Sequence, residues 1–127
     1  MISATAIAWS QSRYGAPDVL TQTPLPARAP GPDEVLVEVE ACALNSADVR
    51  IMRGDPLLIR LAFGLRRPRT AVPGRDVAGR VAAAGSAVTS WAVGDRVVGE
   101  IGGGGLGATV VASAAKFVAI PEGLSSE

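Results

Sequence analysis

The stretch Glu34-Val-Leu-Val-Glu-Val-Glu-Ala41 decides the fold class, because apolar and acidic side chains alternate along it with a period of two. Such a period is typical of a strand that is buried on one face. The pattern predicts that Val35, Val37 and Val39 point into a core. The segment before it, 24–32, holds four prolines in nine residues, so we expect an extended connector there and neither a helix nor a central strand.

Further strands are expected at 3–9, 77–85, 96–101 and within 109–120, where Val, Ile and Thr are frequent and glycines interrupt the runs. Only 4% of the residues are aromatic, so the core has to be built from Val, Ala, Ile and Leu. Short strands at this spacing are typical of a barrel or sandwich. With 127 residues, the chain has the length of a single domain.

The segment 47–65 differs, since its apolar residues approximate helical spacing and Gly54-Asp55-Pro56 interrupts them. We expect two short helices there. Between Arg50 and Arg75 the chain carries seven arginines against one acid, Asp55. This cationic region is either a solvated helix face or the anion-facing rim of a ligand cleft, and the sequence leaves both open.

The glycine run at 102–107 contains a G-x-G-x-x-G pattern at Gly102, Gly104 and Gly107. In a dinucleotide site this pattern joins a strand to a helix. The following Ala108-Thr-Val-Val111 favours a strand instead, and only 20 residues remain after Gly107. We therefore expect a mobile bend at 102–105. A single βαβ unit, with a helix at 108–116 and a strand at 117–120, is the second hypothesis.

The composition excludes several classes of function. Twelve basic and twelve acidic residues cancel, so no global charge points to nucleic acid or an anionic membrane. No apolar run is long enough to span a bilayer and no charged secretory start is present, so we expect a cytoplasmic protein. The absence of histidine removes the commonest general base and zinc ligand. The single cysteine, Cys42, has apolar neighbours and is expected to be a buried thiol rather than a reactive one.

Six short motifs occur in the order known from one family. They are Tyr14-Gly-Ala-Pro-Asp-Val-Leu20, Pro32-Asp-Glu-Val-Leu-Val-Glu-Val-Glu-Ala41, Asn45-Ser-Ala-Asp48, Val72-Pro-Gly-Arg-Asp-Val-Ala-Gly79, Val93-Gly-Asp-Arg-Val-Val98 and Pro121-Glu-Gly-Leu-Ser125. Together they resemble the N-terminal, GroES-like domain of medium-chain dehydrogenases/reductases, in the zinc-independent, quinone-oxidoreductase-like branch. The resemblance implies a mainly β, partly open barrel with a few short helices over residues 1–127.

The resemblance also implies the residues of a site. Zinc enzymes of this superfamily place a cysteine at Asn45 and a histidine at Arg75, so both ligands are missing and no metal is expected. In the zinc-free relatives, hydride passes from NADPH to a quinone or an activated double bond. By this resemblance Asn45 and Asp48 are the expected catalytic residues, and Asn45, Val49, Met52 and Arg75 the expected substrate contacts. We also expect Arg75 to form a buried ion pair with Asp48, because the carboxylate has lost its histidine.

Relatives continue into a Rossmann domain that holds the cofactor. The first hypothesis is therefore the substrate side of a zinc-independent NADPH reductase, which binds NADPH only with a Rossmann partner. The second is a stand-alone, cofactor-free cyclase, isomerase or small-molecule binder, which the unusual Leu106-Gly-Ala-Thr109 favours. The third is a noncatalytic interaction module. A cleft that faces a missing domain exposes apolar surface, so we expect a homodimer or a separate Rossmann-domain partner.

Overall fold

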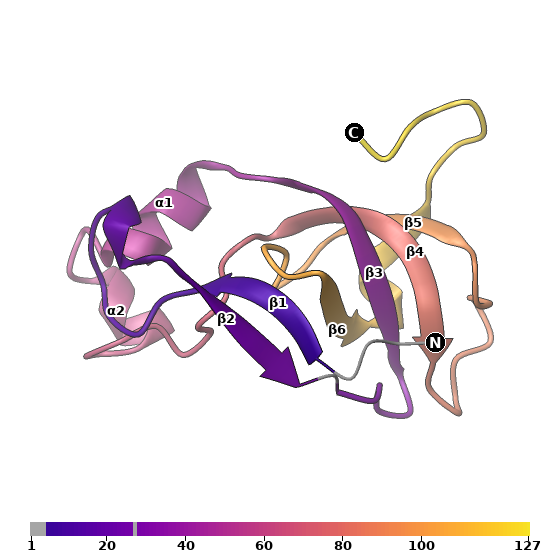
Figure 1. Ribbon diagram of the computed structural model, residues 1–127, viewed down its shortest axis with the longest axis horizontal. Helices are drawn as coiled ribbons and strands as arrows, with labels where there is room; N and C mark the ends of the chain where they lie inside the picture. The colour runs from indigo at the N-terminus through magenta and orange to yellow at the C-terminus, as the bar shows by residue number, and fades with distance from the viewer. Residues whose placement is uncertain (1–4, 27) are drawn as a thin grey trace.

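The computed structural model describes residues 5–26 and 28–127. Strands and short helices follow one another as β1 (Thr5–Ser10), η1 (Pro17–Val19), β2 (Thr21–Pro26), β3 (Glu34–Ala43), α1 (Ser46–Arg53), α2 (Ile59–Phe63), β4 (Asp76–Ala84), β5 (Arg96–Glu100), β6 (Thr109–Ser113), η2 (Ala114–Lys116) and β7 (Phe117–Ala119). Figure 1 shows α1 and α2 at one end of the molecule and the main sheet curving through the other.

The main sheet has five antiparallel strands in the order β6-β3-β4-β5-β7. The long strands β3 and β4 form its centre, and their register shifts twice, between Leu36 and Val37 and between Val39 and Ala41. Such irregularities bend a strand and increase its twist. The sheet therefore curves as a barrel wall does.

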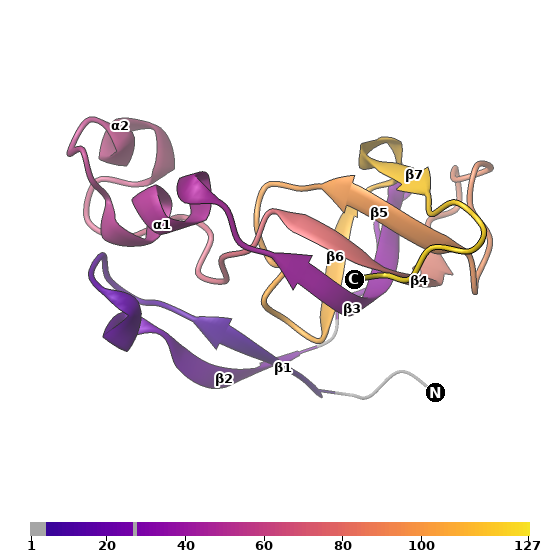
Figure 2. The same ribbon diagram turned by 90° about the horizontal axis from the view of Figure 1, so that it is seen from above.

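The strands β1 and β2 form a separate antiparallel hairpin. It is joined to the segment just before β6, where Trp9 N–H donates to the Leu106 carbonyl at 2.9 Å and Ala108 N–H donates to the Ile7 carbonyl at 3.0 Å. Figure 2 shows the hairpin beside the sheet, with the two not closed into one cylinder. The predicted mainly β, partly open barrel with short helices is confirmed.

The core lies on one face of the main sheet. Val35 and Val37 of β3 are fully buried together with valines of β4 and β5, and Val39 packs partly buried against them. The alternation of β3 thus predicted the inward face. Leu36, on the opposite face, is also buried because the hairpin side covers it: it shares a small hollow with Ala6 and Leu25.

Two predictions about secondary structure were incomplete or wrong. The expected connector 24–32 begins inside β2, an edge strand that includes Pro24 and Pro26. Proline is tolerated at an edge because no ladder bond is lost there. The βαβ hypothesis for 108–120 is wrong, since β6 forms where it placed a helix. The first expected strand began at residue 3, and residues 3 and 4 lie outside the described part of the chain.

The two short helices were predicted correctly. The helix α1 ends at Gly54, which adopts the left-handed conformation with φ 62° that favours glycine. The helix α2 follows after the break at Asp55-Pro56. Among the described residues, no helix has the length and apolar character that crossing a bilayer requires.

Candidate functional site

The site begins at the N-terminus of α1, where Asn45 and Asp48 form a reciprocal capping box. Asn45 Oδ1 accepts from the backbone N–H of Ala47 at 2.9 Å, and Asp48 Oδ2 accepts from the backbone N–H of Asn45 at 3.0 Å. These bonds satisfy N–H groups that have no partner within a helix. The cap fixes the direction in which the chain enters α1.

Both capping side chains also reach the segment that leads into β4. Asp48 Oδ1 accepts from the backbone N–H of Gly74 at 3.2 Å, and Asn45 Nδ2 donates to Asp76 Oδ2 at 2.8 Å. Asp48 is only 5% exposed. A buried carboxylate needs such donors, since burial without hydrogen bonds is costly. The network joins α1 to the first residue of β4 and holds Asn45 in one orientation.

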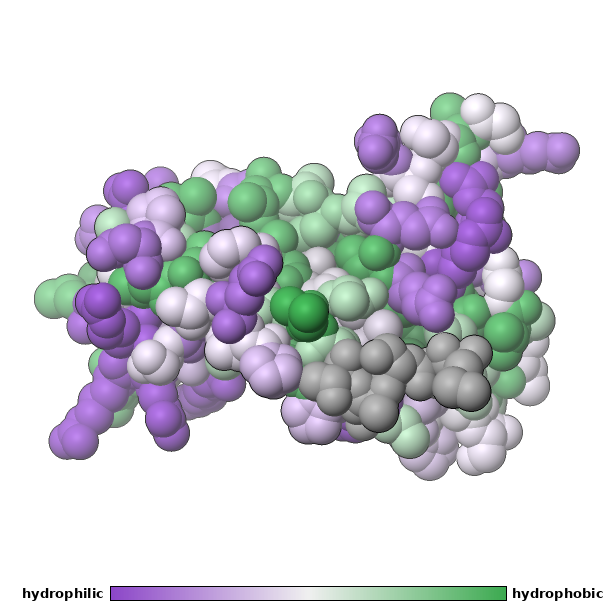
Figure 3. Space-filling view, viewed as in Figure 1, coloured by the Kyte–Doolittle hydropathy of each residue, from purple (hydrophilic) through white to green (hydrophobic). Residues whose placement is uncertain are grey.

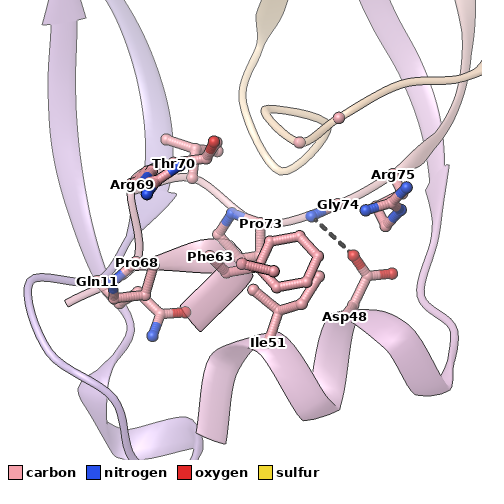
Figure 4. A pocket seen from close by; sticks show the side chains of 14 residues that line it. Gln11, Asp48, Ile51, Phe63, Pro68, Arg69, Thr70, Pro73, Gly74 and Arg75 are labelled. Atoms are coloured by element: carbon pink, nitrogen blue, oxygen red, sulfur yellow. Dashed lines mark hydrogen bonds between the residues drawn. The ribbon is translucent and has the colours of Figure 1, made fainter. Parts of the chain in front are cut away.

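A cavity of about 220 Å³ opens beside this network (Figure 4). Asp48 and Ile51 of α1 and Phe63 of α2 form one side, and the segment 68–75 and the glycines 102–103 complete it. Figure 4 shows Ile51 and Phe63 close together, with Arg75 on the side of Asp48. The cavity therefore combines an apolar wall with a fixed carboxylate and a guanidinium.

The predicted site residues are placed differently from one another. Asp48 and Arg75 line the cavity. Asn45 is not one of its lining residues, but it is hydrogen-bonded to Asp48 and to Asp76. Met52 is 7% exposed and Val49, 43% exposed, lies on the surface of α1; the cavity lining contains neither of them. The structure thus brings three of the predicted residues together and leaves Val49 and Met52 apart.

The predicted ion pair between Asp48 and Arg75 is wrong. Each oxygen of Asp48 already accepts a backbone N–H, so the carboxylate has no need of a guanidinium. The Arg75 side chain instead lies 3.4 Å from Glu100, whose side chain is 67% exposed. An exposed pair of this kind contributes little to stability. Arg75 is therefore available as a contact at the cavity rather than a structural partner of Asp48.

Sequence reasoning missed Gly74 and Asp76 as members of the site. Asn45-x-x-Asp48 is a recognisable capping box, but its bonds to Gly74 and Asp76 join residues up to 31 positions apart. Ile51 and Phe63 were also missed, since an apolar residue on a helix gives the same pattern whether it faces a core or a cavity.

Cys42 is half-buried between this network and the glycine run. Burial raises the pKa of the Cys42 thiol, and the negative charges of Asp48 and Asp76 raise that pKa further. A thiol with a raised pKa is a poor nucleophile at neutral pH. The raised pKa agrees with the expectation that Cys42 is not a reactive thiol, although its side chain is half-buried rather than fully buried.

The glycine run does not have the geometry of a nucleotide cradle. The N–H groups of Gly104, Gly105 and Leu106 donate to the carbonyls of Val72, Gly74 and Pro73 at 2.8–3.0 Å. These N–H groups are therefore not free for a phosphate, and β6 follows where a helix would be needed. The described residues also contain no group of three or more Asp, Glu, Cys or His side chains that could hold a metal ion.

Comparison with known proteins matches residues 31–122 to the alcohol dehydrogenase GroES-like domain. The chain is 37% identical over 117 residues to a chloroplastic quinone-oxidoreductase homolog of Spinacia oleracea, covering 88% of this chain and 33% of that protein. Its fold is similar to that of the CurK enoyl reductase, with a TM-score of 0.84, 30% identity and 95% and 37% of the two chains covered. The fold is also similar to that of a mycobacterial protein complexed with NADPH, with a TM-score of 0.78 and 26% identity. That match covers 95% of this chain and 34% of the mycobacterial chain.

The chain thus spans about a third of the length of these relatives. The matched region includes β3, the capped helix α1 and the segment that carries Gly74 and Asp76. On this evidence of sequence and fold, the chain belongs to the alcohol dehydrogenase GroES-like domain family of the medium-chain dehydrogenase/reductase superfamily.

Proposed function

We propose that the chain is the substrate side of a zinc-independent, NADPH-dependent oxidoreductase that reduces quinones or enones, with the cofactor held by a Rossmann domain. The hydrogen-bond network of Asn45, Asp48, Gly74 and Asp76 carries this proposal. Zinc enzymes of the superfamily supply metal ligands from the positions of Asn45 and Arg75. In this chain hydrogen bonds join the same two segments without a metal.

The exposed apolar surface beside Asn45 is evidence for contact with a second domain. Leu44 is 61% exposed and Val49 is 43% exposed, and these apolar residues precede and follow the cap. Apolar side chains around a polar, well-ordered group are typical of a surface that another domain covers. The relatives named for quinone or enoyl reduction are about three times as long as this chain, which leaves room for such a domain.

When bound by the Rossmann domain, NADPH would supply a hydride for the β-carbon of an enone, and a proton from water at the α-carbon would complete the saturated ketone. The amide nitrogen of Asn45 carries two hydrogens, of which Asp76 accepts one. We propose that the second is donated to the carbonyl oxygen of the substrate, where negative charge develops during hydride transfer. Asp48 acts as a positioning residue, because both of its oxygens are engaged by backbone N–H groups.

The proposal is tested with a fusion in which this chain replaces the corresponding domain of the Spinacia relative, ahead of that protein's own Rossmann domain. NADPH oxidation is followed with a benzoquinone and with an enone. We expect turnover of at least one of them. Asn45→Ser should keep the helix cap but remove the amide donor, and should lower kcat by about 10²-fold.

Ser46→Ala is the matched control, since Ser46 is exposed at the start of α1 and should leave kcat unchanged. A folded fusion that binds NADPH but reduces neither compound would contradict the proposal. So would an activity that Asn45→Ser leaves intact.

A further inference from the structure

A second hollow is a neighbour of the cavity described above, and Arg69 lines both. It is an open groove of about 720 Å³ between the β1–β2 hairpin and the segment 65–71. Ser10, Thr21 and Thr23 line it on the hairpin side, and Arg66, Arg67 and Arg69 line it on the other. We call it the basic groove. Figure 3 shows hydrophilic side chains gathered at this end of the molecule, where α2 and the following loop lie.

The three arginines of the basic groove are exposed, and no acidic residue is part of its described lining. They have no carboxylate within salt-bridge distance among the described residues. Two other arginines of the cationic segment are engaged elsewhere: Arg60 stacks on the Tyr14 ring at 4.6 Å, and Arg75 pairs with Glu100. Of the five remaining arginines of this segment, three line the groove, and the other two, Arg50 and Arg53, are exposed on α1.

The opposite wall supplies hydroxyl groups. Ser10 Oγ and Thr23 Oγ1 lie 2.7 Å apart and share one hydrogen bond, so one of their two hydrogens remains available to a ligand. Guanidinium groups bind phosphate oxygens at two points, and hydroxyl groups add further hydrogen bonds. The volume of the groove lies in the range of small-molecule sites.

We propose that the basic groove binds the phosphate or diphosphate group of a small molecule. This goes beyond the proposed reductase function and does not depend on it. The groove and the cavity share Gln11, Pro68 and Arg69 as lining residues, so they are neighbours along one surface. If the proposed function also holds, the substrate is one that carries a phosphate on an arm and extends past the cavity toward Asn45, which is hydrogen-bonded to the cavity residue Asp48.

Pyrophosphate is the probe for the isolated chain, titrated by calorimetry at low ionic strength without any cofactor. We expect saturable binding at one site that weakens as salt is added, because the arginines are exposed. The combined substitution Arg66→Gln, Arg67→Gln and Arg69→Gln should raise the dissociation constant by at least about tenfold. Thr23→Val should raise it by a smaller factor without changing any charge.

The matched control is Arg50→Gln with Arg53→Gln, which removes exposed positive charges of α1 that are not part of the groove. This variant should stay within about twofold of the unaltered chain, with a melting temperature for each variant as the test of folding. An equal loss in the control would show a diffuse charge effect and overturn the proposal. It would also be overturned by the absence of saturable pyrophosphate binding, or by arginine-dependent binding to phosphatidylserine vesicles alone. None of these results bears on the reductase activity of the fusion.

Discussion

At the scale of single residues, Asp48 is the most strongly constrained group of the site. One oxygen accepts the N–H of Asn45 and the other accepts the N–H of Gly74, and the side chain is 5% exposed. Removing a buried acceptor leaves its donors unsatisfied, which costs more than the hydrogen bonds themselves contribute. Asp48 thus stabilises both the start of α1 and the approach to β4.

Asp48→Ala should lower the free energy of unfolding by about 2–4 kcal/mol, since it removes a helix cap and leaves two backbone N–H groups without an acceptor. Urea unfolding measures the effect. Asp18→Ala is the control, because Asp18 is an exposed acid in the first turn of η1 and should change stability by less than about 0.5 kcal/mol. Equal effects of the two substitutions would contradict the role assigned to Asp48.

Cys42 allows the electrostatics of the same site to be measured. Burial and the charges of Asp48 and Asp76 hold the pKa of the thiol above its usual value. A folded pKa above the unfolded one gives a contribution to stability that is complete below the unfolded pKa. That contribution is lost as the pH rises through the folded pKa, so it disappears on the alkaline side.

We expect iodoacetamide to alkylate Cys42 slowly at neutral pH and faster as the pH rises toward about 10. Asp76→Asn should shift this profile to lower pH, because it removes a negative charge that raises the thiol pKa but keeps an oxygen that Asn45 can bond. Asp18→Asn should leave the profile in place. Fast alkylation at neutral pH, or a shift to higher pH in Asp76→Asn, would be inconsistent with this description.

At the scale of elements, the sequence predicted the strands and helices that depend on local patterns of side chains. The alternation of β3, the interruption between α1 and α2 and the strand after the glycine run follow from side-chain periods and backbone preferences. The strand β2 was missed because prolines within sheets are found mainly in edge strands, and the sequence does not reveal which segment lies at an edge.

The site was predictable only in part, because its composition depends on long-range contacts. The family motifs pointed to Asn45, Asp48 and Arg75 as candidates. Their neighbours Gly74, Asp76, Ile51 and Phe63 come from the packing of α1, α2 and β4. The Asp48–Arg75 pair was predicted wrongly, since the sequence does not reveal that backbone N–H groups already satisfy the carboxylate.

The contact between the glycine run and the segment before β4 gives a test at this scale. Gly74 has φ 100°, and a Cβ there would lie 2.8 Å from both Cys42 Sγ and the Leu106 nitrogen. Gly74→Ala should therefore lower the free energy of unfolding by about 2–4 kcal/mol. Gly102→Ala is the matched control: its Cβ would meet nothing within 4 Å, and stability should change by about 1 kcal/mol or less. A tolerated Gly74→Ala would argue against this packing. The mobility of 102–105 stays a prediction.

At the scale of the whole molecule, the polar network joins α1 to the start of β4, and the cavity beside it is also lined by Gln11 and Phe63. The cavity and the basic groove are neighbours that share Gln11, Pro68 and Arg69, the last two of which belong to the connection between α2 and β4. Exposed Leu44 and Val49 beside the network leave an apolar surface that a partner domain would cover. Our proposal for this domain is that it supports hydride transfer without a metal once a cofactor domain is supplied.

The most direct measurement is deuterium transfer to an enone from NADPH that carries deuterium at both nicotinamide C4 positions. The fusion catalyses the reaction, and mass spectrometry follows it with and without a metal chelator. We expect one deuterium at the β-carbon of the saturated product and the same rate after chelation. A product without deuterium would contradict hydride transfer at this site. A rate that falls on chelation and returns with zinc would contradict the metal-free arrangement of Asn45, Asp48 and Asp76.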